Sequence, residues 1–362
     1  MSLGDERFMA MAVQQARSAM GTTAPNPSVG AVIVRDGVVL GVGHTQPVGG
    51  AHAEVACLRA VSDAGHTADG ATMYVTLEPC RHVGRTAPCT HAVIAAGVSR
   101  VVVGSVDPFP PMQGKGLDDL RAAGIAVDLG LRKEACDAVI RGFARAVTHG
   151  LPEVTLKIAA SLDGNIATAS GESQWITGPD ARSDGHRLRA NHDAILVGVG
   201  TVLADNPRLT VRGVAGDNPV PVILDSRLRT PADSAVFRGT ERVVVICAED
   251  APDVELPADI VRVPRGEGGV DIQAALTEVA RRGLHRVLIE GGGQIARSVL
   301  DARLVDEVVL YQSGRILPGG RPWVGGKPLV SLADAVTLTV RSAGMLGPDV
   351  VLRYGAVHLV EA

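Results

Sequence analysis

Two short stretches, HAE beginning at His52 and EPCRHVGRTAPC at residues 78–89, indicate the fold and the chemistry of this 362-residue chain. His52, Cys80 and Cys89 provide one imidazole and two thiols, which are side chains that bind zinc. A structural zinc site closes with four protein ligands, whereas a catalytic site keeps one position open for water. Glu54 follows the first ligand closely and supplies a carboxylate that is not a ligand. We therefore predict a hydrolytic zinc centre in which Glu54 carries the proton.

The arrangement H-x-E with P-C is the signature of zinc deaminases. These enzymes usually have the thiol spacing C-x-x-C, but here eight residues separate Cys80 from Cys89. The whole stretch EPCRHVGRTAPCTHAVIAAGV, residues 78–98, resembles the N-terminal half of the bifunctional riboflavin-biosynthesis deaminase-reductase family. A long spacer with an internal H-x-G-R-T marks that family. The resemblance implies a cytidine-deaminase-like α/β/α sandwich that binds Zn2+ and uses Glu54 as its catalytic residue.

Segments of the second half look like the reductase half of the same family. They are LKIAASLDGNIAT (156–168), GESQWITG (171–178), TVLADNPRLTVR (201–212) and IEGGG (289–293). The resemblance covers nearly the whole chain and is weakest over residues 230–280. It implies a C-terminal α/β domain similar to dihydrofolate reductase, with NADPH as its cofactor.

The chain length predicts about two domains. Gly150 and Pro152 separate a helical stretch from a new strand. We therefore expect a zinc-dependent pyrimidine deaminase domain over residues 1–148 and an NADPH-dependent reductase domain over residues 149–362.

Strands that alternate with helices predict α/β layers in both halves. In the first half we expect helices over 5–20, 52–64 and 89–96, and strands over 71–76, 100–104 and on both sides of Asp36-Gly37 within 29–44. In the second half we expect strands over 153–160, 194–198, 220–225, 242–247, 286–290, 306–311 and 349–354, and helices over 179–190, 271–282 and 293–301.

Several residues near the zinc motif admit two interpretations. Asn26, held between two prolines, matches a substrate-binding position of the family and offers both a donor and an acceptor to a base edge, although a plain turn is the alternative. We expect Cys57 to belong to the core, and neither His82 nor His91 to be a ligand, with His82 lining the pocket as an alternative. His44 and the turn Gly49-Gly50-Ala51 are weaker candidates for the pocket.

The loop DPFPPMQGKG, residues 107–116, resembles a family loop that normally reads D-P-N-P. Phe109 stands where Asn is usual, which puts a hydrogen bond from that position in doubt. Asp107 and Lys115 remain as polar groups, and Lys115 is a candidate for a phosphate contact or for a solvated surface charge.

In the second half, three glycines lie between a predicted strand and a predicted helix, from Gly291 to Gly293. Such glycines allow backbone amides to approach a pyrophosphate at a helix N-terminus, although a plain turn is an equal alternative. The resemblance implies that the cofactor contacts Ala159, Trp175, Thr201, Asp205, Ser226, Gly292, Gly293 and Gln294. Core packing is the alternative for Trp175, and Arg227, beside Ser226, is either a contact for the 2′-phosphate or a surface charge.

The resemblance also implies residues that hold the substrate of the reductase. They are Ser173, Arg189, Leu209, Arg212 and Glu290. Two arginines suit a phosphate, because each can bind it with two hydrogen bonds. Lys157 lies on the first strand of this half, and Asp163 is interpreted as a turn residue. No general acid is assigned.

Composition disfavours other classes of protein. The net charge is −4 and no Lys/Arg run exceeds two residues, which argues against nucleic acid as a partner. Five cysteines do not resemble a disulfide framework, and the acidic N-terminal stretch does not resemble a signal peptide. No apolar run reaches membrane-spanning length. We expect a cytoplasmic enzyme without a membrane partner, and a homo-oligomer, because the family tends to assemble.

The resemblance implies two successive reactions on a small phosphorylated pyrimidine. The first half would deaminate 2,5-diamino-6-(5-phosphoribosylamino)pyrimidin-4-one with zinc, and the second would reduce the ribosyl chain to ribityl with NADPH. A nucleoside or tRNA deaminase with a non-catalytic C-terminal domain is the alternative. The long thiol spacer and the absence of basic patches oppose it.

Overall fold

The computed structural model describes residues 3–81, 87–326 and 329–356. The chain divides into two compact units, Met1–Leu151 and Pro152–Ala362. The expected boundary between residues 148 and 149 falls at the end of helix α5 (Lys133–His149), shortly before this division. Among the described residues, no helix is long and apolar enough to cross a membrane.

The first unit contains a five-stranded sheet with the order β2-β1-β3-β4-β5. Its strands are β1 (Gly30–Arg35), β2 (Val38–His44), β3 (Thr72–Leu77), β4 (Arg100–Ser105) and β5 (Ala126–Leu129). β1 is antiparallel to β2 and β3, and β3, β4 and β5 are parallel. Asp36 and Gly37 both have positive φ, 54° and 77°, which is the backbone of a tight hairpin turn. The predicted hairpin is confirmed.

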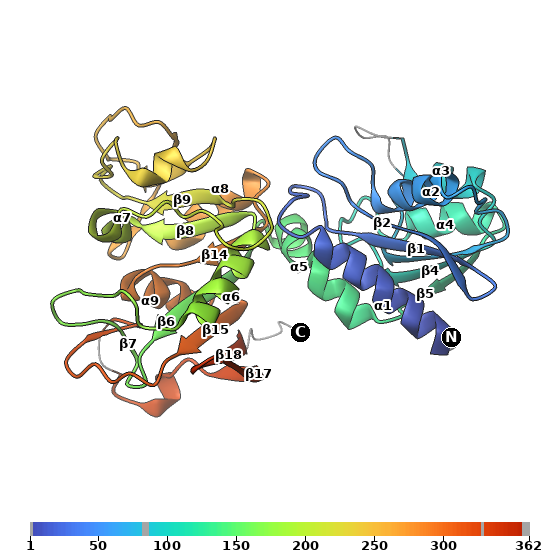
Figure 1. Cartoon of the computed structure of the whole chain (residues 1–362). Helices are drawn as coiled ribbons and strands as arrows, with labels where there is room; N and C mark the ends of the chain where they lie inside the picture. Colours follow the sequence, from blue (N-terminus) through green and yellow to red (C-terminus); the bar gives the residue numbers. More distant parts are fainter. Residues whose placement is uncertain (1–2, 82–86, 327–328, 357–362) are drawn as a thin grey trace. The chain divides into compact units, whose positions relative to one another are not determined.

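Helices cover both faces of this sheet. They are α1 (Leu3–Ser18), α2 (Ala53–Asp63), α3 (Cys89–Ala95), α4 (Lys115–Ala122) and α5. α1 and α5 pack on one face, while α2, α3 and α4 pack on the other, so the unit is the expected α/β/α sandwich (Figure 1). α4 and β5 were not predicted, because α4 is short and polar and β5 is a short strand at the edge of the sheet.

Two glycines allow the helices to approach the sheet closely. A Cβ on Gly43 of β2 would lie 2.4 Å from the backbone nitrogen of Cys57 on α2. A Cβ on Gly30 of β1 would lie 2.0 Å from the carbonyl oxygen of Ala12 on α1. Only glycine fits these positions, and the position of α2 therefore depends on Gly43.

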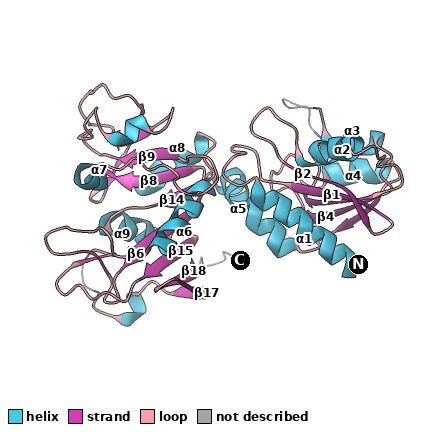
Figure 2. Ribbon diagram, viewed as in Figure 1, coloured by secondary structure: helices cyan, strands magenta, loops and turns pink. Residues whose placement is uncertain are grey.

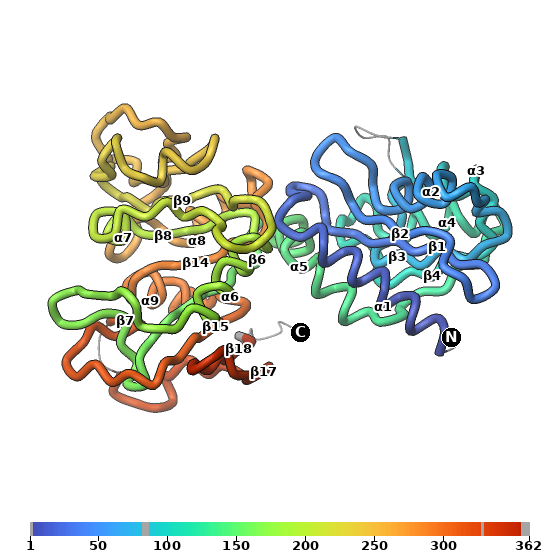
Figure 3. The backbone as a smooth tube through the Cα atoms, viewed as in Figure 1, coloured from blue at the N-terminus to red at the C-terminus, as the bar shows by residue number. Residues whose placement is uncertain are grey.

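The second unit contains a nine-stranded sheet with the order β11-β10-β9-β8-β14-β6-β15-β18-β17 (Figure 2). Its strands are β6 (Glu153–Ala160), β8 (Ala194–Gly198), β9 (Val220–Leu224), β10 (Val244–Ala248), β11 (Asp259–Val263), β14 (Arg286–Ile289), β15 (Glu307–Gln312), β17 (Leu338–Leu346) and β18 (Asp349–Ala356). The strands from β11 to β15 in this order are parallel, and β18 and β17 continue the sheet antiparallel. β6 pairs with both β14 and β15, which come much later in the sequence. The tube in Figure 3 follows this path of the chain from green to orange.

The helices of the second unit largely match the sequence prediction. They are α6 (Pro179–Ala190), α7 (Val199–Asp205), α8 (Ile272–Arg281) and α9 (Gly293–Asp301), with short 3-10 turns at Ala235–Arg238 and Leu332–Asp334. Four short strands, β7 (Asn165–Ala167), β12 (Arg265–Gly266), β13 (Gly269–Val270) and β16 (Arg321–Pro322), form two small pairs. Helix α7 was missed because it is short and follows the apolar strand β8 directly. β17 was missed because its middle residues are exposed and show no alternation.

Candidate functional site

Three side chains of the first unit converge as the sequence predicted. His52 immediately precedes α2, Cys80 lies in the turn after β3, and Cys89 is the first residue of α3. The Nδ1 atom of His52 lies 3.5 Å from Cys80 Sγ and 3.2 Å from Cys89 Sγ, and the three atoms are all within 4.8 Å of one another. Two adjacent helix starts thus bring their ligands to one point.

The cluster fits zinc. In a tetrahedral zinc site, neighbouring nitrogen and sulfur ligands are about 3.5 Å apart. The thiol of Cys89 and the imidazole of His52 hydrogen-bond to Cys80 and lower the pKa of its thiol to about 4, which favours the thiolate that a metal requires. In the described part of the chain, no other group of three or more His, Cys, Asp or Glu side chains is arranged to hold a metal ion.

Glu54 lies beside this cluster in the first turn of α2, where it is only 4% exposed. Burial, and then the charge of Cys80, raise the pKa of Glu54 in the metal-free chain to about 7. A carboxyl group with a pKa near neutrality can both accept and release a proton at working pH. The environment of Glu54 therefore suits the predicted proton carrier.

The other cysteine and histidines near the zinc motif do not belong to the described ligand cluster. Cys57 is fully buried in the core between α2 and the sheet, as expected. His91 is exposed on α3 and is not part of the ligand cluster. His82 lies outside the described residues.

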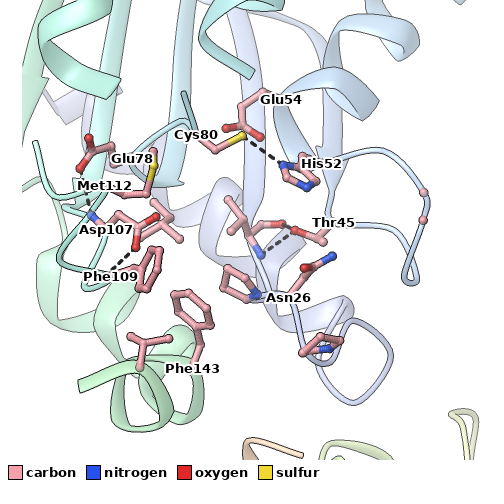
Figure 4. Close-up of a pocket in the computed structure, with 17 residues that line it drawn as sticks. Asn26, Thr45, His52, Glu54, Glu78, Cys80, Asp107, Phe109, Met112 and Phe143 are labelled. Atoms are coloured by element: carbon pink, nitrogen blue, oxygen red, sulfur yellow. Dashed lines mark hydrogen bonds between the residues drawn. The ribbon is translucent and has the colours of Figure 1, made fainter. Parts of the chain in front are cut away.

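The cluster opens into a cavity of about 450 Å3. Figure 4 shows His52, Glu54 and Cys80 at one end, with Phe109 and Phe143 at the other. Its walls are formed by Pro25, Asn26, Pro27, Val29, Thr45, Gly49, Gly50, His52, Glu54, Leu77, Glu78, Cys80, Asp107, Phe109, Met112, Phe143 and Val147. A volume of this size accommodates a small molecule rather than a polymer.

Most of the weaker candidates can be placed relative to this cavity. Asn26 lines it, and so do Gly49 and Gly50. His44 does not line the cavity. Its Nδ1 instead lies 3.4 Å from Gln15 Oε1 on α1. A role for Asn26 in substrate binding stays a prediction.

The loop over residues 107–116 forms one wall of the cavity. Phe109 and Met112 line it, whereas the Lys115 ammonium donates to the carbonyl oxygen of Pro111 at 2.7 Å. Sequence reasoning missed Glu78, a buried carboxylate that binds backbone amides of this loop. The available signal was its position directly before Pro79 and Cys80.

In the second unit, the cofactor candidates gather at one edge of the sheet. β6, β14, β8 and β9 are parallel neighbours, so their carboxyl ends lie together. Ala159 is near the end of β6, and Ser226 comes shortly after β9. Thr201 and Asp205 belong to helix α7, which follows β8 directly, and Gly292, Gly293 and Gln294 form the start of α9 after β14. Trp175 is the exception, because it lies in the segment between β7 and α6. The topology therefore brings together residues that are far apart in sequence, at the edge where α/β sheets bind ligands.

The substrate candidates Arg189 and Glu290 form a direct ion pair. Arg189 Nε and one of its terminal nitrogens donate to the two carboxylate oxygens of Glu290 at 2.8 and 2.9 Å, and its other terminal nitrogen donates to Thr210 O at 2.9 Å. Lys157 Nζ lies 3.6 Å from the same carboxylate. Burial opposes ionisation of Glu290, but the charges of Lys157 and Arg189 outweigh it and lower its pKa to about 2. The expected two-point contact of Arg189 with a phosphate is thus directed to Glu290 instead.

Arg212 is exposed and lies close to this pair. Its backbone amide donates to His186 Nδ1 at 3.3 Å, and its guanidinium donates to Thr210 Oγ1 at 3.2 Å. Burial and the charges of Arg189 and Arg212 lower the pKa of His186 to about 4, so its Nε2 carries the proton at neutral pH. Sequence reasoning missed His186, although it lies on α6 one turn before Arg189.

The remaining candidates differ in their surroundings. Trp175 is 60% exposed with the Arg182 guanidinium 4.5 Å from its ring centroid, so the core-packing alternative is wrong. Leu209 is buried in the core with a positive φ of 57°, which leaves its backbone, rather than its side chain, for a ligand. Asp163 accepts from Ser161, Asn165 and the Leu317 backbone, as expected of a turn residue. Ser173 is half-buried.

Comparisons with known proteins identify both units. Residues 3–105 match the cytidine and deoxycytidylate deaminase zinc-binding region, and residues 152–352 match the RibD C-terminal domain. A solved structure from Thermotoga maritima, described as a diaminohydroxyphosphoribosylaminopyrimidine deaminase/5-amino-6-(5-phosphoribosylamino)uracil reductase, is similar with a TM-score of 0.88 and 34% identity over 98% of this chain and 99% of that one. The chain therefore joins a zinc-binding deaminase domain to a reductase domain.

Similar sequences show which family of deaminase-reductases the chain belongs to. The chain is 40% identical to the riboflavin biosynthesis protein RibD of Escherichia coli, over 99% of this chain and 100% of that protein. It is 38% identical to RibD of Aquifex aeolicus, over 96% and 97% of the two chains. The chain belongs to the RibD family of bifunctional deaminase-reductases of riboflavin biosynthesis.

Proposed function

We propose that this chain carries out two successive reactions of riboflavin biosynthesis. The first unit deaminates 2,5-diamino-6-(5-phosphoribosylamino)pyrimidin-4-one by hydrolysis, and the second reduces the ribosyl chain of the product to ribityl with NADPH. The observation that carries the proposal is the convergence of His52, Cys80 and Cys89 beside Glu54 at one end of a small-molecule cavity. Membership of the RibD family supports the order of the two reactions.

In the deaminase, His52, Cys80 and Cys89 hold the zinc ion. Zinc, when bound, makes water nucleophilic at neutral pH. Glu54, buried beside the ligand cluster, would hold and pass on the proton that water loses and the departing ammonia takes up. Asn26 orients the pyrimidine through the donor and the acceptor of its side-chain amide.

In the reductase, residues that follow the strands of the sheet, together with Trp175, hold the cofactor. They are Ala159, Trp175, Thr201, Asp205, Ser226, Gly292, Gly293 and Gln294. NADPH supplies a hydride when bound. Gly292 precedes α9, and a Cβ at this position would meet no atom within 4 Å, so a phosphate can approach the backbone amides of the helix start.

The substrate of the reductase is held beside the ion pair of Arg189 and Glu290. Arg212 is exposed and available to the phosphate, while Arg189 orients Glu290 toward the substrate. Ser173 and the backbone of Leu209 complete the set. The net charge of −4 gives no general basic surface, so local cations such as Arg212 suit a small phosphorylated substrate better than a nucleic acid.

The proposal extends to the cellular setting. The protein acts in the cytoplasm on a free metabolite. A net charge of −4, which gives no general affinity for nucleic acid or for an anionic membrane, is consistent with this. A homo-oligomer is supported by the outer strand β17, whose residues Val340 and Met345 are 57% and 67% exposed.

The rival function, a nucleoside or tRNA deaminase with a non-catalytic C-terminal domain, is not favoured. The match of residues 152–352 to the RibD C-terminal domain and the near-complete coverage of RibD relatives oppose it. Binding of tRNA in a gel assay at moderate salt would revive it.

Mass spectrometry of the products tests the proposal. The zinc-loaded chain is incubated with the diaminopyrimidinone ribosyl phosphate, with and without NADPH. We expect a deaminated product without NADPH and a deaminated, reduced product with it. Deamination alone under both conditions would leave a single-function deaminase, and no conversion would reject the substrate.

A further inference from the structure

Glu78 follows β3 directly and points away from the zinc ligands. Its carboxylate is 3% exposed and accepts three backbone N–H groups. Oε2 accepts from Asp107 at 3.0 Å and from Gly114 at 2.9 Å, and Oε1 accepts from Gly116 at 2.8 Å. All three donors belong to the loop and helix start over residues 107–116. One side chain therefore determines the path of a whole loop.

The geometry leaves little freedom at the other end of this loop. A Cβ on Gly116 would lie 2.1 Å from the carbonyl oxygen of Pro79, next to Glu78. Gly114 has a φ of 80°, which glycine adopts without strain. The loop is thus pressed against the Glu78–Pro79 turn and held there by charge-assisted hydrogen bonds.

The same loop forms the cavity wall. Asp107, Phe109 and Met112 line the cavity together with Glu78 itself. The Phe109 amide donates to Asp107 Oδ1 at 2.9 Å, so the loop turns immediately after the residue that Glu78 binds (Figure 4). The chain has only four phenylalanines, and two of them, Phe109 and Phe143, line this cavity.

We infer that Glu78 is a positioning residue of the deaminase, which sets the affinity for the pyrimidine substrate by fixing the 107–116 wall of the cavity. The inference rests on the proposed deamination. Glu78 touches neither the ligand cluster nor Glu54 through any hydrogen bond among the described residues, so its effect is on substrate binding rather than on proton transfer.

Steady-state kinetics of ammonia release test this inference on the full-length, zinc-loaded chain. The variants are Glu78→Gln, which keeps the shape but replaces one acceptor oxygen by a donor, and Glu78→Ala, which removes all three hydrogen bonds. We expect KM for deamination to rise by about tenfold in Glu78→Gln and by about a hundredfold in Glu78→Ala, with kcat falling by less than about fivefold. Zinc content and the reduction of deaminated substrate should not change.

Asp5→Asn is the matched control. Asp5 is also a buried carboxylate of the first unit, but it binds Tyr74 and Arg100 and does not line the cavity. This variant should lower thermal stability without raising KM. An equal rise in KM in Asp5→Asn would overturn the inference, because the effect would then be general destabilisation.

Further results of the same kinetics would overturn the role of Glu78. Unchanged KM in both Glu78 variants, or a loss of kcat or zinc at constant KM, would overturn the inference. If the Glu78 variants do not fold, the test uses Gly116→Ala, whose methyl group displaces the loop while the Glu78 carboxylate remains. The same rise in KM for deamination is expected in this variant. An unchanged KM overturns the inference. Failure of the wild-type chain to release ammonia would reject the proposed function itself.

Discussion

Glu54 and Glu290 are both buried carboxylates, yet their surroundings shift their pKa values in opposite directions. Burial and the charge of Cys80 raise the pKa of Glu54 to about 7. At Glu290, the charges of Lys157 and Arg189 outweigh burial and lower the pKa to about 2. Glu54 is therefore suited to transfer protons, while Glu290 is a fixed negative charge that orients its neighbours.

Replacing Glu54 tests the proton-transfer role. Glu54→Gln should reduce the rate of ammonia release by about a thousandfold or more, because general acid–base catalysis contributes on that scale. The zinc content should stay at the wild-type level, since the ligands are untouched, and reduction should be unaffected. Ammonia release and metal analysis measure both, and a variant that retains its activity would remove Glu54 from the mechanism.

Arg212→Ala tests the substrate side of the reductase. Loss of a charge-assisted hydrogen bond to a phosphate should raise KM for reduction by about 10- to 100-fold, while deamination stays unchanged. Arg187→Ala, an exposed residue of α6 whose side chain pairs with Asp184, is the control. A simultaneous loss of both activities would contradict the assignment of separate sites to the two units.

At the scale of elements, the end of α6 is joined to β6 by a buried histidine. His192 Nδ1 donates to the carbonyl oxygen of Leu188 at 2.6 Å, and its Nε2 accepts from Thr155 Oγ1 at 2.9 Å. Burial, and then the charge of Arg286, lower the pKa of His192 to about 3. The imidazole is therefore neutral in the folded protein over the whole range in which an unfolded histidine becomes charged.

This linkage predicts acid sensitivity of the second unit. The unfolded chain binds the extra proton below about pH 6.5, so the free energy of unfolding should fall as pH decreases from 6.5 toward 3, by about 2 kcal/mol between pH 7.5 and pH 5. His192→Gln should flatten this pH dependence, although it lowers stability at neutral pH. Denaturant unfolding at several pH values measures this pH dependence of the free energy of unfolding. His91→Gln, at an exposed residue of α3, is the control. An unchanged slope would show that other groups govern the acid response.

A second element-scale prediction concerns the contact between β2 and α2. The methyl group of Gly43→Ala would meet the backbone of Cys57 and Ala53, so α2, which follows His52 and carries Glu54, must move. We expect a loss of roughly 1–3 kcal/mol in stability and faster removal of zinc by a chelator. Gly200→Ala is the control, because no atom lies within 4 Å of its Cβ position. Normal zinc retention in Gly43→Ala would show that the ligands tolerate movement of the helix.

At the scale of the whole molecule, each unit has its own sheet, core and candidate site. Most of the sequence prediction concerns each unit alone and depends on local patterns, such as helix starts after His52 and Pro88. The missed elements include α4, β5, α7 and β17. They are short or exposed, so they lack the apolar periodicity on which the prediction depended.

Separate sites predict that two defective chains complement each other. A mixture of Glu54→Gln and Arg212→Ala chains should convert the diaminopyrimidinone to the deaminated, reduced product, because each chain keeps one intact unit and the intermediate is a diffusible small molecule. Mass spectrometry of the mixture and of each variant alone measures this. No product from the mixture, with each single activity intact, would indicate that the intermediate is transferred only within a chain.

The sequence by itself determined the family and the order of the two units, and it predicted the convergence of His52, Cys80 and Cys89 beside Glu54, because these depend on residue types at short spacings along the chain. Only the tertiary structure decided which groups Glu78 and Arg189 bind. Glu78 is 38 residues from Gly116, and Arg189 is 101 residues from Glu290. Such pairs form where the topology of parallel strands and loops brings distant segments to one edge of a sheet, and no local pattern in the sequence specifies the distance between them.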